Sequence, residues 1–176
     1  LVTGVQTCAL PILKPHLTFE DIKSRAALLC RWAIAKGNLA IRTHVDICDP
    51  TLLAVRALIE VREEMRPYLD IQLVAFPQDG YFRYPDAQRL LTESLDLGVD
   101  VVGGIPHFER TMSEGARSVT ALCELAAERG LLVDMHCDET DDPMSRHVET
   151  LAFETQRLGL HGRVSGSHLT SDRKST

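Results

Sequence analysis

The residues best placed to do chemistry lie at the end of a short apolar run, within residues 131–140. The letters Leu-Leu-Val-Asp-Met are followed at once by His136, Asp138 and Glu139. Such a run is typical of a buried parallel strand whose carboxyl end opens into a site. An imidazole can bind zinc or iron(II), and a carboxylate three residues later can carry the proton of an activated water to a leaving group. The alternatives are a histidine that hydrogen-bonds the backbone and a solvated loop carboxylate.

Two other apolar runs also end in residues that could contact a substrate. Gln78 follows Phe-Pro, and its amide offers a donor and an acceptor that suit a pyrimidine or amide edge. His168 follows Ser-Gly-Ser and could be a second metal ligand, a donor that polarises the substrate, or an ordinary loop histidine. Gln78 could equally be a plain loop residue. The aromatic stretch 81–84 is expected to be a packed surface loop rather than a lid.

The remaining polar residues near strand ends give weaker indications. His44 and Asp46 could face the same site, but we expect them to lie behind it or to cap the core. His107 could contact substrate, and Asp138 is expected to orient His136 or its own loop rather than to bind metal. Three further histidines are expected to face solvent: His16, His147 and His161.

The elements that must position these residues recur at regular spacing. Strand-like runs begin near residues 38, 70, 99, 131 and 163. The repeat of about 31 residues is the length of one βα unit, and strands that alternate with helices predict a parallel sheet. Four of the seven histidines fall at expected strand ends: His44, His107, His136 and His168. No Gly-x-Gly-x-x-Gly follows a strand, which disfavours a dinucleotide-binding fold.

This pattern predicts an α/β fold, a partial (β/α)8 TIM barrel. The carboxyl ends of the strands carry the chemistry in such barrels, and a complete one needs about 250 residues. We therefore expect roughly five of the eight βα units here. Capping residues mark the expected helix starts: Thr18 with Asp21, Asp49-Pro50, Asp86, Ser113 and Asp142-Pro143.

Composition narrows the class of protein. The 176 residues are 44% hydrophobic and 25% charged, with a net charge of -6 and no basic stripe, which disfavours nucleic-acid binding. The sequence has no run of 18 apolar residues, so no membrane span is expected. The five scattered cysteines, an odd number without a CxxC pair, favour reduced thiols in a cytoplasmic protein over disulfides or structural zinc, and Cys137 is expected to serve packing.

Both ends of the chain differ in character from the rest. Residues 1–12 and 171–176 resemble translated adapter sequence rather than protein. We therefore expect the barrel domain to occupy residues 13–170 and both ends to be non-native.

Six segments together resemble the bacterial cytosine deaminases, a branch of the metal-dependent amidohydrolase superfamily. The segments are 17–25, 42–46, 74–78, 100–109, 134–139 and 167–168. The resemblance implies hydrolytic conversion of cytosine to uracil and ammonia, by attack of metal-activated hydroxide at C4. It also implies a small-molecule substrate, one divalent ion (iron(II) or zinc), and a cytoplasmic, homo-oligomeric enzyme of pyrimidine salvage.

Carried over by position, the resemblance assigns four roles. His136 is the metal ligand of the fifth barrel strand, and Glu139 is the proton shuttle. His168 polarises the water or the substrate, and Gln78 hydrogen-bonds the pyrimidine edge.

The family's other metal ligands have no match in this chain. Those are a His-x-His pair on the first barrel strand and an Asp on the eighth, and His44-Val-Asp46 on the second strand is not that pair. With His136 alone of the four ligands, we expect this chain by itself to bind metal weakly and to be inactive. Two alternatives stay open: a related amidohydrolase acting on another cyclic amidine or amide, and a catalytically inert, truncated barrel.

Overall fold

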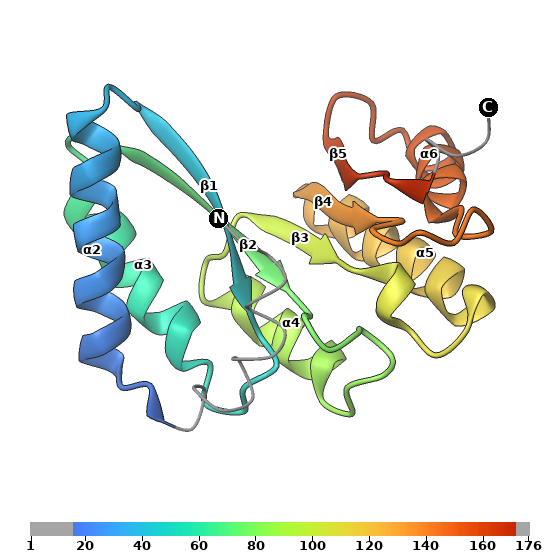
Figure 1. Cartoon of the computed structure of the whole chain (residues 1–176), viewed down its shortest axis with the longest axis horizontal. Coiled ribbons are helices and arrows are strands. Elements are labelled where there is room, and N and C mark those ends of the chain that lie inside the picture. Colours follow the sequence, from blue (N-terminus) through green and yellow to red (C-terminus); the bar gives the residue numbers. More distant parts are fainter. Residues whose placement is uncertain (1–15, 172–176) are drawn as a thin grey trace.

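The computed structural model describes residues 16–171 as one curved sheet of five parallel strands with helices against its outer face (Figure 1). The strands pair in the order in which they occur in the sequence. They are β1 (Ala40–Asp46), β2 (Asp70–Phe76), β3 (Val101–Gly104), β4 (Leu132–Cys137) and β5 (Val164–His168). The expectation that both chain ends are non-native falls almost wholly outside the described residues.

Each strand connects to the next through a helix, so the fold is a half-barrel of the predicted (β/α) type. The helices are α2 (Phe19–Ala35), α3 (Leu53–Met65), α4 (Ala87–Asp96), α5 (Met112–Arg129) and α6 (His147–Arg157), with a 3-10 turn, η2 (Pro106–Phe108). Helix α3 packs on β1 and β2, α4 on β2 and β3, α5 on β3 and β4, and α6 on β5. The predicted strand positions and the parallel sheet are confirmed.

Local capping explains the start of α2. Thr18 Oγ1 accepts the N–H of Asp21 at 3.2 Å, and the Asp21 carboxylate accepts the N–H of Thr18 at 3.4 Å. Gly37 follows the helix with a φ of +84°, a left-handed conformation that glycine adopts without strain. This capping box confirms the predicted helix start.

Three predicted helix starts differ from the structure. Helix α5 begins at Met112 rather than at Ser113, because Thr111 Oγ1 accepts the N–H of Glu114 at 3.0 Å and caps the helix. Helix α3 begins at Leu53 instead of at Asp49-Pro50, because the Asp49 carboxylate accepts the N–H of Leu53 at 3.0 Å and closes a turn before the helix. Helix α6 begins at His147 instead of at Asp142-Pro143. The Asp142 side chain accepts the N–H of Met144 in a separate turn, and the Asp138 carboxylate accepts the N–H groups of His147 and Val148 where the helix starts.

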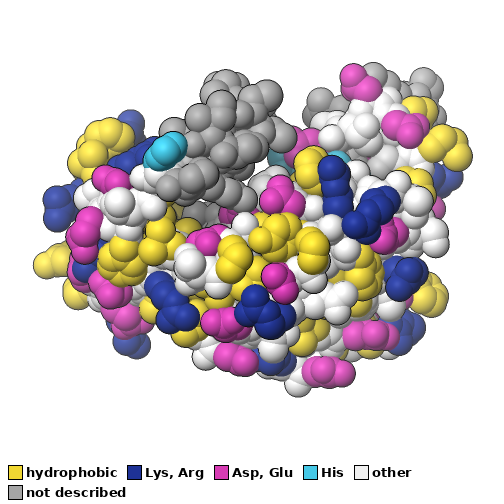
Figure 2. All heavy atoms as spheres, turned by 90° about the horizontal axis from the view of Figure 1, so that it is seen from below, with side chains coloured by type: hydrophobic (Ala, Val, Ile, Leu, Met, Phe, Trp, Pro, Cys, Tyr) yellow, Lys and Arg dark blue, Asp and Glu magenta, His cyan; other side chains and the backbone are white. Residues whose placement is uncertain are grey.

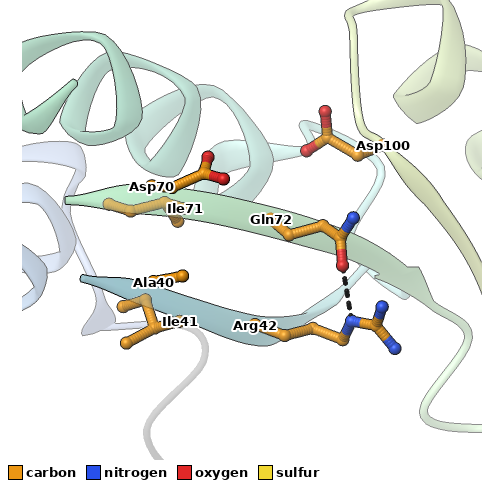
Figure 3. A pocket seen from close by; sticks show the side chains of 7 residues that line it. All are labelled: Ala40, Ile41, Arg42, Asp70, Ile71, Gln72 and Asp100. Carbon is orange, nitrogen blue, oxygen red and sulfur yellow. Dashed lines mark hydrogen bonds between the residues drawn. The ribbon is translucent and has the colours of Figure 1, made fainter. Parts of the chain in front are cut away.

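A polar layer crosses the middle of the concave face. Paired residues of parallel strands face the same side, and the register pairs Arg42 with Gln72 and Asp134 with Ser165. The Arg42 guanidinium donates to Gln72 Oε1 at 2.6 Å, Asp134 Oδ2 at 2.6 Å and Ser165 Oγ at 3.2 Å. Arg42 and Gln72 line a hollow of about 270 Å³ near the amino ends of β1 and β2. Figure 3 shows the side chains that line it. This hollow lies away from the strand ends where chemistry is expected.

The surface carries both signs of charge. On the face seen in Figure 2, Lys and Arg side chains are interspersed with Asp and Glu, and apolar side chains lie among them. Among residues 16–171 there is no helix with the length and apolar character needed to cross a membrane.

Candidate active site

Rings from four strands meet near the carboxyl ends of the sheet. The His136 ring on β4 lies 4.4 Å from that of His44 on β1, 4.6 Å from Phe76 on β2 and 4.5 Å from His168 on β5, between ring centroids. His136 therefore lies at the centre of the cluster. The strand-end position predicted for it is the place where the neighbouring strands converge.

Gly103 on β3 makes the room that this cluster needs. A Cβ at Gly103 would lie 2.7 Å from Val74 Cγ1 and 2.9 Å from Phe76 Cδ2, closer than real Cβ atoms approach. The missing side chain lets the Phe76 ring lie against β3 and reach His136.

Three groups at this end could hold a metal ion together. His136 Nδ1 lies 3.3 Å from His168 Nε2, and His168 Nδ1 lies 3.4 Å from Glu139 Oε1. One ligand atom from each residue falls within 4.8 Å of the others. Two imidazoles and a carboxylate are a donor set that suits zinc or iron(II), so these residues fit a divalent ion.

The His136 imidazole is held neutral. Burial, followed by the neighbouring His44 and His168 rings, lowers the pKa of His136 from 6.5 to about 4. A neutral imidazole keeps a lone pair for a metal, so this environment favours metal binding near neutral pH.

Asp134 lies next to the ring cluster, two residues before His136 on β4. Its side chain is nearly buried, with one oxygen 2.6 Å from Arg42 Nη1 and the other 3.4 Å from His44 Nε2. Burial raises the pKa of this carboxyl, but His44 and Arg42 outweigh it and the net pKa is lowered, so Asp134 stays charged. His44, Asp134 and His136 could also group around a cation. Because Arg42 already neutralises this carboxylate, we assign Asp134 a supporting position.

The other residues singled out from the sequence lie close to this end of the sheet. Gln78 is half-buried two residues beyond β2, and its side chain makes no hydrogen bond with another residue of 16–171. The Asp46 carboxylate accepts the N–H of Cys48 at 2.8 Å. His107 lies in η2, where burial lowers its pKa, and it lines a hollow of about 180 Å³ that His147 also lines.

The aromatic loop after Gln78 is packed, as expected. The Glu109 carboxylate accepts the N–H groups of Tyr81 at 2.6 Å, Phe82 at 3.1 Å and Arg83 at 2.9 Å. Burial raises the pKa of Glu109, although these N–H groups act against it. Sequence reasoning missed this role; the only local signal was an acidic residue directly after the Pro-His-Phe turn.

Three expectations about the end of β4 and the region after it have clear outcomes. His147 is 2% exposed and packs against Gly115, so the prediction that it faces solvent is wrong. The Asp138 carboxylate bonds its own loop and the start of α6, one of the two roles expected for it. Cys137 is fully buried and burial raises its pKa to about 12, which fits a packing role.

A parallel half-barrel with histidines and a carboxylate at its strand ends is the architecture of a metal-dependent barrel hydrolase. Residues 14–175 match the Amidohydrolase family. The chain therefore belongs to the amidohydrolase family.

Proteins named for different substrates are similar to this chain in sequence. The chain is 35% identical over 155 residues to N-isopropylammelide isopropyl amidohydrolase of Pseudomonas sp. strain ADP, a match that covers 87% of this chain and 38% of that protein. It is 31% identical to the pterin deaminase of Rhizobium rhizogenes, over 86% of this chain and 34% of that protein. The chain thus spans less than two fifths of the length of these relatives.

Solved structures agree with the fold. The 5-methylcytosine deaminase of Klebsiella pneumoniae liganded with phosphonocytosine superposes with a TM-score of 0.92 at 42% identity, over 96% of this chain and 41% of that one. The N-isopropylammelide isopropylaminohydrolase of Burkholderia multivorans gives a TM-score of 0.74 at 32% identity, over 81% and 37%.

Proposed function

We propose that this chain forms the five-strand part of an amidohydrolase that deaminates cytosine or a close analogue. The observation that carries the proposal is the 42% identity and the TM-score of 0.92 to a 5-methylcytosine deaminase, over nearly the whole chain. Its support in this chain is the grouping of His136, Glu139 and His168 at one end of the sheet.

We infer a role for each residue from the family resemblance and from its position at the strand ends. His136 would hold the divalent ion, with His168 beside it. Zinc or iron(II), when bound, supplies a water of lowered pKa. The Glu139 carboxylate would take a proton from the attacking water and return one to the departing amine, so that cytosine and water give uracil and ammonia. His168, 3.4 Å from Glu139, orients and polarises the reacting groups, and the Gln78 amide pairs with the pyrimidine edge.

A second candidate keeps the fold and the metal but changes the substrate. The relatives named for N-isopropylammelide and for pterin are 35% and 31% identical to this chain, so another cyclic amidine or amide is the alternative. Gln78 and the loop fixed by Glu109 would then meet a different ring.

A chimera tests the proposal while supplying the rest of a barrel. Residues 16–171 replace the matching segment of the Klebsiella enzyme, and ammonia release is measured with cytosine, 5-methylcytosine, N-isopropylammelide and pterin. We expect the cytosines to be turned over, and Glu139→Gln to lower the rate by about 10²–10⁴-fold.

The matched control is Glu128→Gln, an exposed carboxylate near the carboxyl end of α5 that should leave the rate unchanged. Turnover of pterin or N-isopropylammelide, but of neither cytosine, would replace the first candidate with the second. The chain on its own is expected to be inactive in the same assay.

A further inference from the structure

The carboxylate of Asp138 holds the start of α6. It is 1% exposed and accepts hydrogen bonds from Ser145 Oγ at 2.7 Å and from the backbone N–H groups of His147 at 2.9 Å and Val148 at 3.0 Å. These bonds satisfy N–H groups that a helix leaves without partners in its first turn. Asp138 therefore closes the loop that runs from β4 to α6.

The backbone of the same residue holds the segment that follows His168. The carbonyl oxygen of Asp138 accepts from Thr170 Oγ1 at 3.1 Å and from the N–H of Ser171 at 3.2 Å. Ser171 Oγ in turn donates to the carbonyl of Ser145 at 2.8 Å. One residue thus joins the loop that carries Glu139 to the segment just after His168.

The conformation of Asp138 changes which side chain faces the site. Side chains alternate along a strand, so a continued β4 would put Asp138 on the face of His136 and Glu139 on the opposite face. Asp138 instead has a φ of +57°, in the left-handed region. Its side chain contacts α6, whereas the Glu139 carboxylate lies 3.4 Å from His168 Nδ1.

We propose that Asp138 is a positioning residue that sets Glu139 against His168. The proposal rests on the proposed function, which gives those two residues their catalytic roles. In this role Asp138 acts through its backbone turn and through the hydrogen bonds that join the two segments.

The test uses the full 176-residue chain, labelled with ¹⁵N and free of metal and substrate. Long-range ¹H–¹⁵N spectra report the state of each histidine ring. Asp138→Asn keeps a residue that tolerates the left-handed turn but puts an amide NH₂ where a carboxylate oxygen accepts hydrogen bonds. We expect the His168 ring signals to shift in the direction given by Glu139→Gln, which removes the charge beside that ring.

The matched control is Asp142→Asn, the same change in the same loop at an exposed side chain that bonds the N–H of Met144. It should leave the His168 signals at their wild-type positions. Changes confined to α6 amides in Asp138→Asn, with His168 unmoved, would overturn the proposal. If Asp138→Asn does not fold, Ser145→Ala removes one of the three bonds and should give a smaller shift of the same sign, and its absence would also overturn the proposal.

This readout separates the inference from the proposed function. If the chimera deaminates none of the substrates but the His168 ring signals shift in Asp138→Asn, the proposed function is refuted and the positioning role of Asp138 stands. If the chimera deaminates cytosine but the His168 ring signals of Asp138→Asn stay at their wild-type positions, only the positioning role is refuted.

Discussion

Gly103→Ala should destabilise the chain, because β3 passes too close to β2 to admit a side chain. The added Cβ would lie 2.7 Å from the carbonyl oxygen of Ala75 and from Val74 Cγ1, and 2.9 Å from Phe76 Cδ2. The Ala75 oxygen belongs to the backbone and Val74 Cγ1 to a stiff β-branched side chain, so moving either atom costs free energy. Overpacking of this kind lowers the free energy of unfolding by about 1–3 kcal/mol.

Urea unfolding followed by far-UV circular dichroism measures this loss. With a slope of about 2 kcal/mol per molar urea, a loss of 2 kcal/mol moves the midpoint by about 1 M. Gly166→Ala is the matched control, since Gly166 also lies in a strand and its Cβ would meet Leu151 Cδ2 at an ordinary 3.5 Å. We expect the control to be neutral or stabilised by up to about 1 kcal/mol. Equal midpoints for the two variants would refute the close-packing argument.

Three further predictions concern the charges and edges of the half-barrel. Asp134→Asn should weaken zinc binding to the chain about ten-fold, as measured by calorimetry. The control Asp100→Asn, which alters an ion pair with Arg62 away from the site, should leave the zinc affinity unchanged. Equal zinc affinities of the two variants would contradict this prediction. Because the pKa of His136 is lowered from 6.5 to about 4, the unfolded chain takes up that proton first as pH falls, and stability is lost across this window. His136→Asn should flatten that loss in urea unfolding between pH 7 and pH 4.5, and an unchanged slope would argue against it. Strands β1 and β5 have no outer neighbour within residues 16–171, so the chain should self-associate in sedimentation velocity; a monodisperse monomer with a sharp cooperative melt would be the contrary result.

Much of the fold could be predicted because its signals are local. The apolar runs and the capping residues repeat once per βα unit, and the strand beginnings lie within two residues of their predicted positions. Strand-end placement of His136 and His168 follows from the same pattern, since parallel strands bring their carboxyl ends to one edge.

The errors arise where a distant contact outweighs a local signal. Asp142-Pro143 is a good local helix start, yet α6 begins later because Asp138 supplies the acceptors for its first N–H groups. His147 is buried because Gly115 on α5 leaves space for its ring, a contact that no local pattern reveals. The ring contact between His44 and His136 likewise depends on sheet curvature, which spacing along the chain does not specify.

Anomalous X-ray diffraction at the zinc edge, on crystals of the chimera grown with zinc, tests the central claim most directly. We predict a peak about 2.0–2.1 Å from a ring nitrogen of His136, with His168 and Glu139 facing it. A zinc peak elsewhere, or a His136 ring turned away from an occupied metal site, would contradict the account.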